Sequence, residues 1–146
     1  MEGLNVICGE KDNLLIVILC GRIRGQEVPK LEELEAKILG SNHELILCNF
    51  RDVATLMPGA HGPFAKFQQS IRSAGKLLGI CSLKPEMKAA LLQSGLVRES
   101  ELFNNVAEGW ARLKDRKARM NAEAKAPNKT QKEKPQDAEV EMKKAA

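Results

Sequence analysis

The sequence has few of the residues that usually carry chemistry. Among its 146 residues it has no tyrosine, two histidines and four cysteines. The cysteines stand singly in or beside apolar stretches and form no C-x-x-C pair, so we expect no zinc site. Small buried thiols in a reducing cytosol explain them, since free cysteine packs as a small hydrophobic residue. The four are Cys8, Cys20, Cys48 and Cys81. We therefore expect a cytoplasmic protein without metal or cofactor.

Long hydrophobic runs are also absent. The longest, Leu14 to Cys20, is far shorter than the roughly 20 residues that cross a bilayer. The chain does not start with a basic segment followed by an apolar one, so we expect neither export nor membrane insertion. A hydrophobic content of 43% is enough for one real core at this length. We expect a small soluble globular domain with a tail.

The net charge of +4 comes from one end of the chain. Residues 114–146 hold ten Lys and Arg against six Asp and Glu, while residues 1–113 hold thirteen of each sign. The stretch from about Ala124 onward has no aromatic residue and mixes both charges, which is typical of disorder and gives little support to nucleic-acid binding. We expect one domain over residues 1–115, and a helix end with a disordered charged tail over residues 116–146.

Apolar periodicity and turn residues predict an alternation of strands and helices. A hairpin comes first, and each later strand is separated from the next by a single helix. Such connections need right-handed crossovers, so the later strands should be parallel, with helices packed on the sheet. The chain should fold as an α/β domain with a mixed four- to five-stranded sheet and about four helices. The expected strands are Leu4–Cys8, Leu14–Cys20, Glu44–Phe50, Lys76–Ser82 and a short piece at Glu101–Phe103, and the expected helices are Gln26–Leu39, Phe64–Ser73, Pro85–Ser94 and one from Asn105 that frays near Met120.

This order resembles the STAS domain, the fold of bacterial anti-sigma factor antagonists. The resemblance is carried by a strand ending in Gly (LIVILCGRI), a Leu-Glu helix (VPKLEELEAKI), a strand and turn (ELILCNFRDVATL), a helix and strand (FAKFQQSIRSAGKLLGICSL), a Pro-started helix (KPEMKAALLQSGL) and a last helix (ESELFNNVAEGWARL). It covers about Leu4 to Leu113. It implies a protein that binds other proteins and has no catalytic activity.

In the family, the junction between one strand and the next helix carries Asp-Ser-Ser-Gly, whose second Ser is phosphorylated by a kinase that is also the anti-sigma factor. Met57, Pro58, Gly59 and Ala60 fall on that motif in order. Gly59 takes the phosphoserine position, so the resemblance implies a surface without this switch. Pro63 limits the helix start to about Gly59 or later, because a proline inside a helix removes a hydrogen bond and clashes one turn back.

The resemblance implies that the junction loop and the exposed face of the following helix bind the partner. Phe64, Phe67 and Ile71 recur at helical spacing and should be buried. The candidate binding residues are Met57, Pro58, Gly59, Ala60, His61, Gly62, Lys66, Gln69 and Ser70.

Three other uses of the junction are weaker. His61 as a general base or phosphohistidine has no carboxylate nearby in the sequence, and an exposed loop residue is the simpler reading. Thr55 and Ser70 are the nearest hydroxyls and are more simply a turn residue and a residue of the solvent face. Nucleotide binding lacks both G-x-x-x-x-G-K and G-x-G-x-x-G.

Two functions fit the resemblance. The first is an interaction module similar to anti-sigma factor antagonists, binding a kinase-like anti-sigma factor or another regulatory protein. The alternative is a STAS-like accessory subunit of an inner-membrane transport ATPase. A small enzyme is disfavoured because no nucleophile–base pair or metal set can be assembled from the sequence. The sequence leaves the partner and the oligomeric state open.

Overall fold

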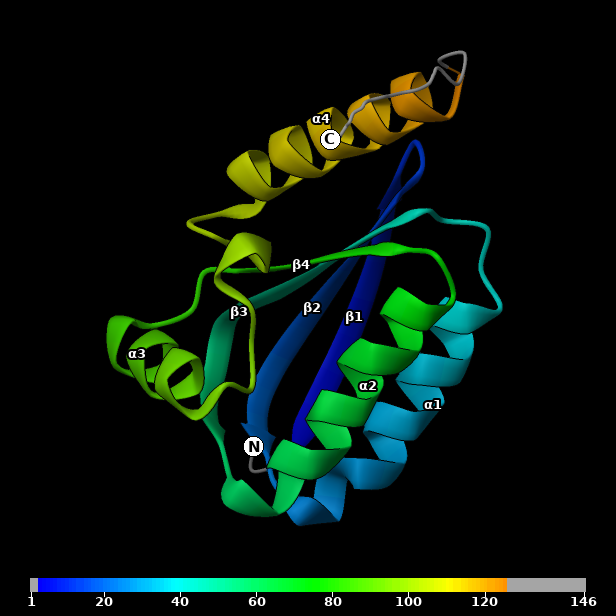
Figure 1. Cartoon of the computed structure of the whole chain (residues 1–146). Helices are drawn as coiled ribbons and strands as arrows, with labels where there is room; N and C mark the ends of the chain where they lie inside the picture. The colour runs from blue at the N-terminus through cyan, green and yellow to red at the C-terminus, as the bar shows by residue number, and fades with distance from the viewer. Residues whose placement is uncertain (1–2, 126–146) are drawn as a thin grey trace. The chain divides into compact units, whose positions relative to one another are not determined.

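A mixed five-stranded sheet forms the centre of the domain (Figure 1). The computed structural model describes residues 3–125, of which residues 3–114 form one compact unit and residues 115–125 belong to a second. The strands follow chain order, with β1 antiparallel to β2 and every later neighbour parallel. This confirms the α/β prediction. The strands are β1 Leu4–Lys11, β2 Leu14–Ile23, β3 Leu45–Leu56, β4 Leu77–Cys81 and β5 Leu102–Phe103.

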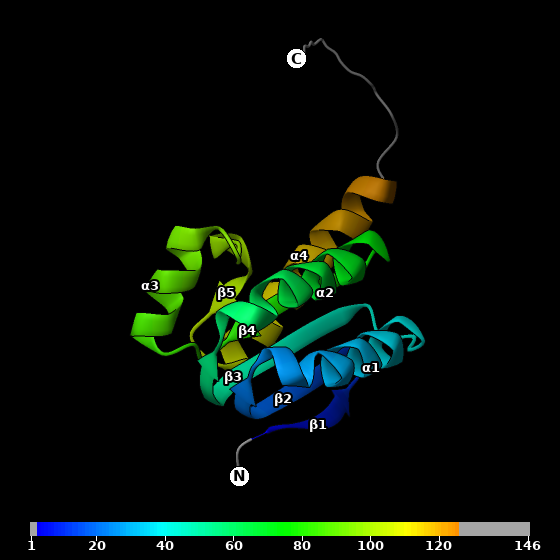
Figure 2. The ribbon, with the colours of Figure 1, turned by 90° about the horizontal axis from the view of Figure 1, so that it is seen from below.

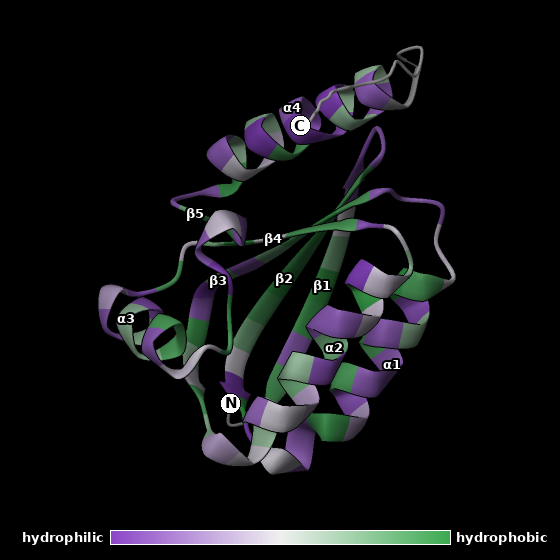
Figure 3. Cartoon of the chain, viewed as in Figure 1, coloured by the Kyte–Doolittle hydropathy of each residue, from purple (hydrophilic) through white to green (hydrophobic). Residues whose placement is uncertain are grey.

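Helices α1 and α2 lie side by side on one face of the sheet, as Figures 1 and 2 both show. Nearly all of their buried residues are apolar, and the ribbon of each helix alternates between hydrophobic and hydrophilic colours in Figure 3. Short 3-10 turns precede α1 and α2, and a third precedes β5. The helices are α1 Val28–Leu39, α2 His61–Ser73, α3 Pro85–Ser94 and α4 Val106–Lys125, and the 3-10 turns are η1 Gly25–Glu27, η2 Pro58–Ala60 and η3 Glu99–Glu101.

Three phenylalanines anchor the core between α2 and the sheet. Phe50 of β3 meets Phe64 edge-on with ring centroids 5.6 Å apart, and Phe64 stacks on Phe67 at 5.7 Å. All three side chains are at most 1% exposed. The aromatic residues of α2 are therefore structural, as their helical spacing predicts.

The first turns of α4 cover part of the opposite face. Leu113 is fully buried against Leu14, Leu45 and Leu47. A Cβ at Gly109 would come within 2.8 Å of the Leu47 side chain, so any larger residue would require Leu47 to shift. Trp110 is half-buried, with the ammonium groups of Lys11 and Lys114 at 4.3 and 3.9 Å from its ring centroid. These are cation–π distances.

The hairpin is longer and tighter than the sequence predicts. The turn is only Asp12 and Asn13, since Lys11 pairs with Leu14, and Asp12 adopts a positive φ of 56°. Asn and Asp tolerate this conformation, which suits two-residue hairpin turns. Gly21 of β2 has φ 103°, and a Cβ there would overlap the Gly3 carbonyl oxygen. This position requires glycine.

Strand β3 also continues past its expected end at Arg51 and Asp52. Val53 is fully buried and Leu56 is 8% exposed, and they pair with Gly21 and Ile23 of β2, the first after one register shift and the second after two. In each shift β3 has one residue more than β2, as in a bulge, and the alternation of the sequence does not reveal this. The extension carries the chain to the junction.

The last helix begins as predicted and runs further. The backbone N–H of Glu108 donates to Asn105 Oδ1 at 2.8 Å, while Glu108 Oε1 accepts from the backbone N–H of Asn104 at 2.7 Å. This reciprocal cap resembles a capping box moved by one residue. The helix continues to Lys125 and does not fray near Met120. The expected disordered tail lies outside the described residues, apart from this helix end.

The cysteines divide into two kinds. Cys48 and Cys81 are fully buried, and burial raises the pKa of both thiols above the ordinary range. They are inert core residues at neutral pH. Cys8 and Cys20 are half-exposed, so the expectation of burial is wrong for these two. No helix within residues 3–125 is long and apolar enough to cross a bilayer.

Candidate functional site

The junction between β3 and α2 is a solvent-exposed turn fixed by backbone hydrogen bonds. The Met57 N–H donates to the Ile23 carbonyl at 2.8 Å, and the Ala60 N–H donates to the Met57 carbonyl at 2.9 Å. Ala60 is fully buried and anchors the turn, while Met57 is 43% exposed and Pro58 and Gly59 face solvent. The turn thus presents backbone and one thioether, with neither acid nor hydroxyl.

A second turn, η1, lies against the first. The Cα and N of Gly25 lie 3.6 Å from the place where a Cβ of Gly59 would stand. The two turns therefore present one continuous surface, made by segments more than thirty residues apart. The sequence did not identify η1 as part of this surface. Its one local signal is the spacing of Arg24 and Glu27, three residues apart around a glycine.

An ion pair holds η1 in place. Glu27 Oε1 accepts from Arg24 Nε and from the Arg24 backbone N–H, both at 3.0 Å, and Glu27 Oε2 accepts from Arg24 Nη2 at 2.9 Å. These hydrogen bonds, led by the one from the Arg24 side chain, lower the pKa of Glu27. Glu27 is only 6% exposed, so its carboxylate serves the fold of the turn and is not offered to a ligand.

Helix α2 has the two faces that its spacing predicts. Phe64, Phe67 and Ile71 are buried, and Lys66 and Gln69 are exposed. Ser70 is half-buried, so it contributes less to the exposed face than expected. Met57, Pro58 and Gly59 form one surface with the exposed residues of α2, which include Lys66 and Gln69. We call this the junction surface.

His61 has a structural role in the junction. Its ring is half-buried, and Nε2 donates a hydrogen bond to the Leu56 carbonyl oxygen at 3.1 Å. The ring thereby ties the first turn of α2 to the end of β3. Thr55 is also engaged, since its hydroxyl donates to Met57 Sδ at 3.5 Å. The helix itself starts at His61, within the limit that Pro63 sets.

The far end of α2 is held by a polar cluster that the sequence did not predict. Arg72 donates through Nη2 to Glu101 at 2.6 Å and through Nε at 3.0 Å, and Nη2 also donates to Gln68 Oε1 at 3.0 Å. Gln68 is buried and donates to the Leu96 carbonyl at 3.0 Å. The cluster joins α2 to the segment before β5, and every one of these groups is used within the fold.

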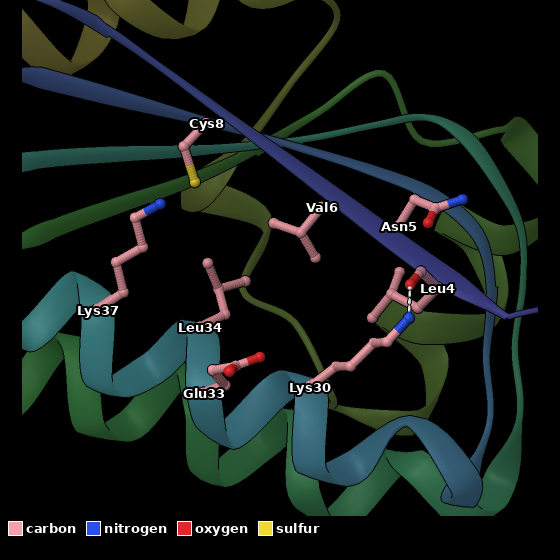
Figure 4. A pocket seen from close by; sticks show the side chains of 8 residues that line it. All are labelled: Leu4, Asn5, Val6, Cys8, Lys30, Glu33, Leu34 and Lys37. Atoms are coloured by element: carbon pink, nitrogen blue, oxygen red, sulfur yellow. Dashed lines mark hydrogen bonds between the residues drawn. The ribbon is translucent and has the colours of Figure 1, made fainter.

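The described residues offer little for catalysis. Within residues 3–125 no three His, Cys, Asp or Glu side chains gather to hold a metal ion. The junction surface brings together no acid, base and nucleophile. A groove of about 420 Å³ lies elsewhere, between β1 and α1 (Figure 4). The arrangement at the junction suits binding.

Comparison with known proteins identifies the fold. No family model and no curated protein matches the sequence. Among solved structures, RsbS from Moorella thermoacetica has a TM-score of 0.67 at 15% identity, covering 77% of this chain and 97% of that one. An anti-sigma factor antagonist from Mycobacterium paratuberculosis has a TM-score of 0.67 at 14% identity, covering 77% and 96%. A sulfate transporter family protein from Wolinella succinogenes has a TM-score of 0.64 at 16% identity, covering 73% and 88%. The chain has a STAS-like fold.

Proposed function

We propose that this protein is a non-catalytic interaction module that binds a regulatory protein through the junction surface. This fold suits recognition, because it presents a fixed and exposed turn and residues 3–125 assemble no catalytic group there. The proposal places it in the cytoplasm, where such a partner would be found.

The observation that carries the proposal is Gly59. The resemblance of the sequence to the family aligns it with the phosphoserine position, and it is exposed in the turn η2 just before α2. A phosphate of about −1.5 to −2 charge at a helix start would change how a partner docks there. Gly59 has no hydroxyl and Met57 replaces the acid, so the surface stays in a single, unmodified state.

The charge of the junction surface indicates the chemistry of the partner. Helix α2 contains no Asp or Glu, and its charged residues are Lys66 and Arg72. Arg72 is paired with Glu101, which leaves Lys66 as the exposed cation of the helix. The partner should therefore present a carboxylate or a carbonyl oxygen opposite Lys66, within a mostly uncharged contact.

A second candidate is favoured by one of the comparisons. The Wolinella succinogenes protein is named for a sulfate transporter family and shares this fold. An accessory subunit of an inner-membrane transport ATPase would use the same junction surface for a different partner. The two candidates differ in what they bind and agree on where they bind it.

A pull-down with the tagged full chain tests the proposal, with bound proteins identified by mass spectrometry. We expect a kinase-like ATPase or a sigma regulator, whereas a nucleotide-binding subunit of a transporter would support the second candidate. Lys66→Glu should weaken the captured complex at least tenfold without lowering the melting temperature. Lys88→Glu is the matched control, since Lys88 is an exposed lysine on α3. Equal weakening by both variants, or by neither, would place the binding surface elsewhere.

A further inference from the structure

Strand β1 is an edge of the sheet with backbone groups directed outward. The Arg22 N–H donates to the Gly3 carbonyl, so the odd-numbered residues of β1 bond to β2. In an antiparallel pair the residues between them direct N–H and C=O away from the neighbouring strand. Val6 and Cys8 therefore present their backbone groups at the edge. The carbonyl of Leu4 accepts a hydrogen bond from Lys30 Nζ, which closes that end of the edge.

The middle of this edge lacks the features that usually protect one. Proteins blunt edge strands with charges, prolines or bulges. The stretch Leu4–Gly9 (LNVICG) has no charged residue and no proline, and it pairs with β2 without a register shift. Ile7, at its middle, is 58% exposed. Free backbone groups spaced along a strand fit another extended strand, and the exposed isoleucine calls for an apolar partner.

We propose that β1 pairs with β1 of a second copy of this chain, antiparallel and about a two-fold axis at Ile7. In this register Val6 faces Cys8 of the second copy, and each of these pairs exchanges two backbone hydrogen bonds. Ile7 faces Ile7 of the second copy in the closer, non-hydrogen-bonded type of pair, which covers the exposed side chain. The contact is isologous, so each surface is its own complement.

Charge complementarity on α1 supports a second copy in this register. Figure 4 shows α1 running beside β1, with Lys30 next to Leu4, Leu34 below Val6 and Lys37 next to Cys8. Because Val6 of one copy pairs with Cys8 of the other, the part of α1 beside Val6 in one copy lies opposite the part of α1 beside Cys8 in the other. Glu33, which lies beside Leu34, is then opposite Lys37 of the second copy, where the two opposite charges attract. The two-fold symmetry repeats this pair of charges once.

The interface uses none of the residues of the junction surface. Both junction surfaces of the dimer stay free, so the dimer would present two binding sites to a partner. Loss of the dimer would lower avidity and leave binding to a single site intact. The experiments on the dimer and on the proposed function are therefore independent, and one proposal can be wrong while the other is right.

Sedimentation of the full chain over micromolar to millimolar concentrations is the first test. We expect a monomer–dimer equilibrium, and the amides of Val6 and Cys8 should exchange with solvent more slowly as the concentration rises. The Ile7 amide, which bonds to β2, should show no such change and is the internal control. Ile7→Lys should leave the chain folded and monomeric, because two ammonium groups would face each other at the axis.

A charge swap tests the register. Glu33→Lys and Lys37→Glu should each weaken the dimer at least tenfold, since each one brings like charges together. The double variant should restore it, because the swapped pair is again complementary. Glu32→Lys is the control, as Glu32 is exposed on α1 and is not among the residues that line the groove. A chain that stays monomeric at all concentrations, or a double variant weaker than both single ones, would overturn the proposal.

Discussion

Truncating Phe67 tests how α2 divides into a buried and an exposed face. Phe67 is 1% exposed and stacks on Phe64 with 17° between the ring planes, while Phe64 meets Phe50 edge-on. Phe67→Ala removes the ring at one end of this row and leaves a cavity beneath the helix. Such truncations cost about 3–5 kcal/mol. This is a large share of the roughly 5–15 kcal/mol that stabilises a typical domain.

Urea unfolding followed by circular dichroism measures this loss. The midpoint should fall while the slope with denaturant stays the same, since the surface exposed on unfolding hardly changes. Lys66→Ala is the matched control on the neighbouring position of the helix. Lys66 is exposed, so its variant should stay within about 0.5 kcal/mol of the wild type. Equal destabilisation by the two variants would refute the assignment of faces, and with it the junction surface.

Three further changes test the rest of the domain. Removing residues 126–146 should leave the melting temperature nearly unchanged, as their composition lacks core-forming residues; a large fall in a calorimetric scan would contradict the proposed boundary. Arg72→Met should cost about 3 kcal/mol in urea unfolding because it leaves Glu101 buried without its partner, and the double variant Arg72→Met with Glu101→Leu should recover most of the loss. The pKa of Glu27 is lower in the folded protein than in the unfolded chain. Its contribution to the free energy of unfolding is therefore fully present above the pKa of the unfolded chain and is lost as the pH falls through the pKa of the folded protein. Wild type should therefore lose more stability than Glu27→Gln between neutral and strongly acidic pH, and parallel curves would contradict this.

Local pattern was enough to predict the order of elements and the inward face of α2. Strand runs, helical spacing and caps are properties of short segments, so one sequence reveals them. The extension of β3 depends on two register shifts and on pairing with β2, in which the paired residues are about thirty positions apart. The same holds for Arg72 with Glu101, and for Gly25 with Gly59. These contacts exist only after folding, and no local spacing indicates them.

The backbone at Gly59 would accept a residue with a side chain. Its φ is not positive, and a Cβ there would meet Gly25 at 3.6 Å, an ordinary contact. The backbone therefore does not require glycine, and serine should fit with little loss of stability. If Gly59 takes the family's phosphoserine position, as we propose, the fold does not impose the loss of the hydroxyl.

Restoring the motif tests whether the switch is absent or has moved. The triple variant Met57→Asp, Pro58→Ser and Gly59→Ser should fold and should gain one phosphoryl group from ATP and the kinase recovered with the partner. The unaltered protein, treated in the same way, should gain none at residues 57–62. Gly59→Ala is the control for folding, since it adds the Cβ without the hydroxyl. Phosphate on His61 or Thr55 of the unaltered protein, with a matching loss of partner binding, would show that the junction surface keeps a switch at another residue and would refute the single-state proposal.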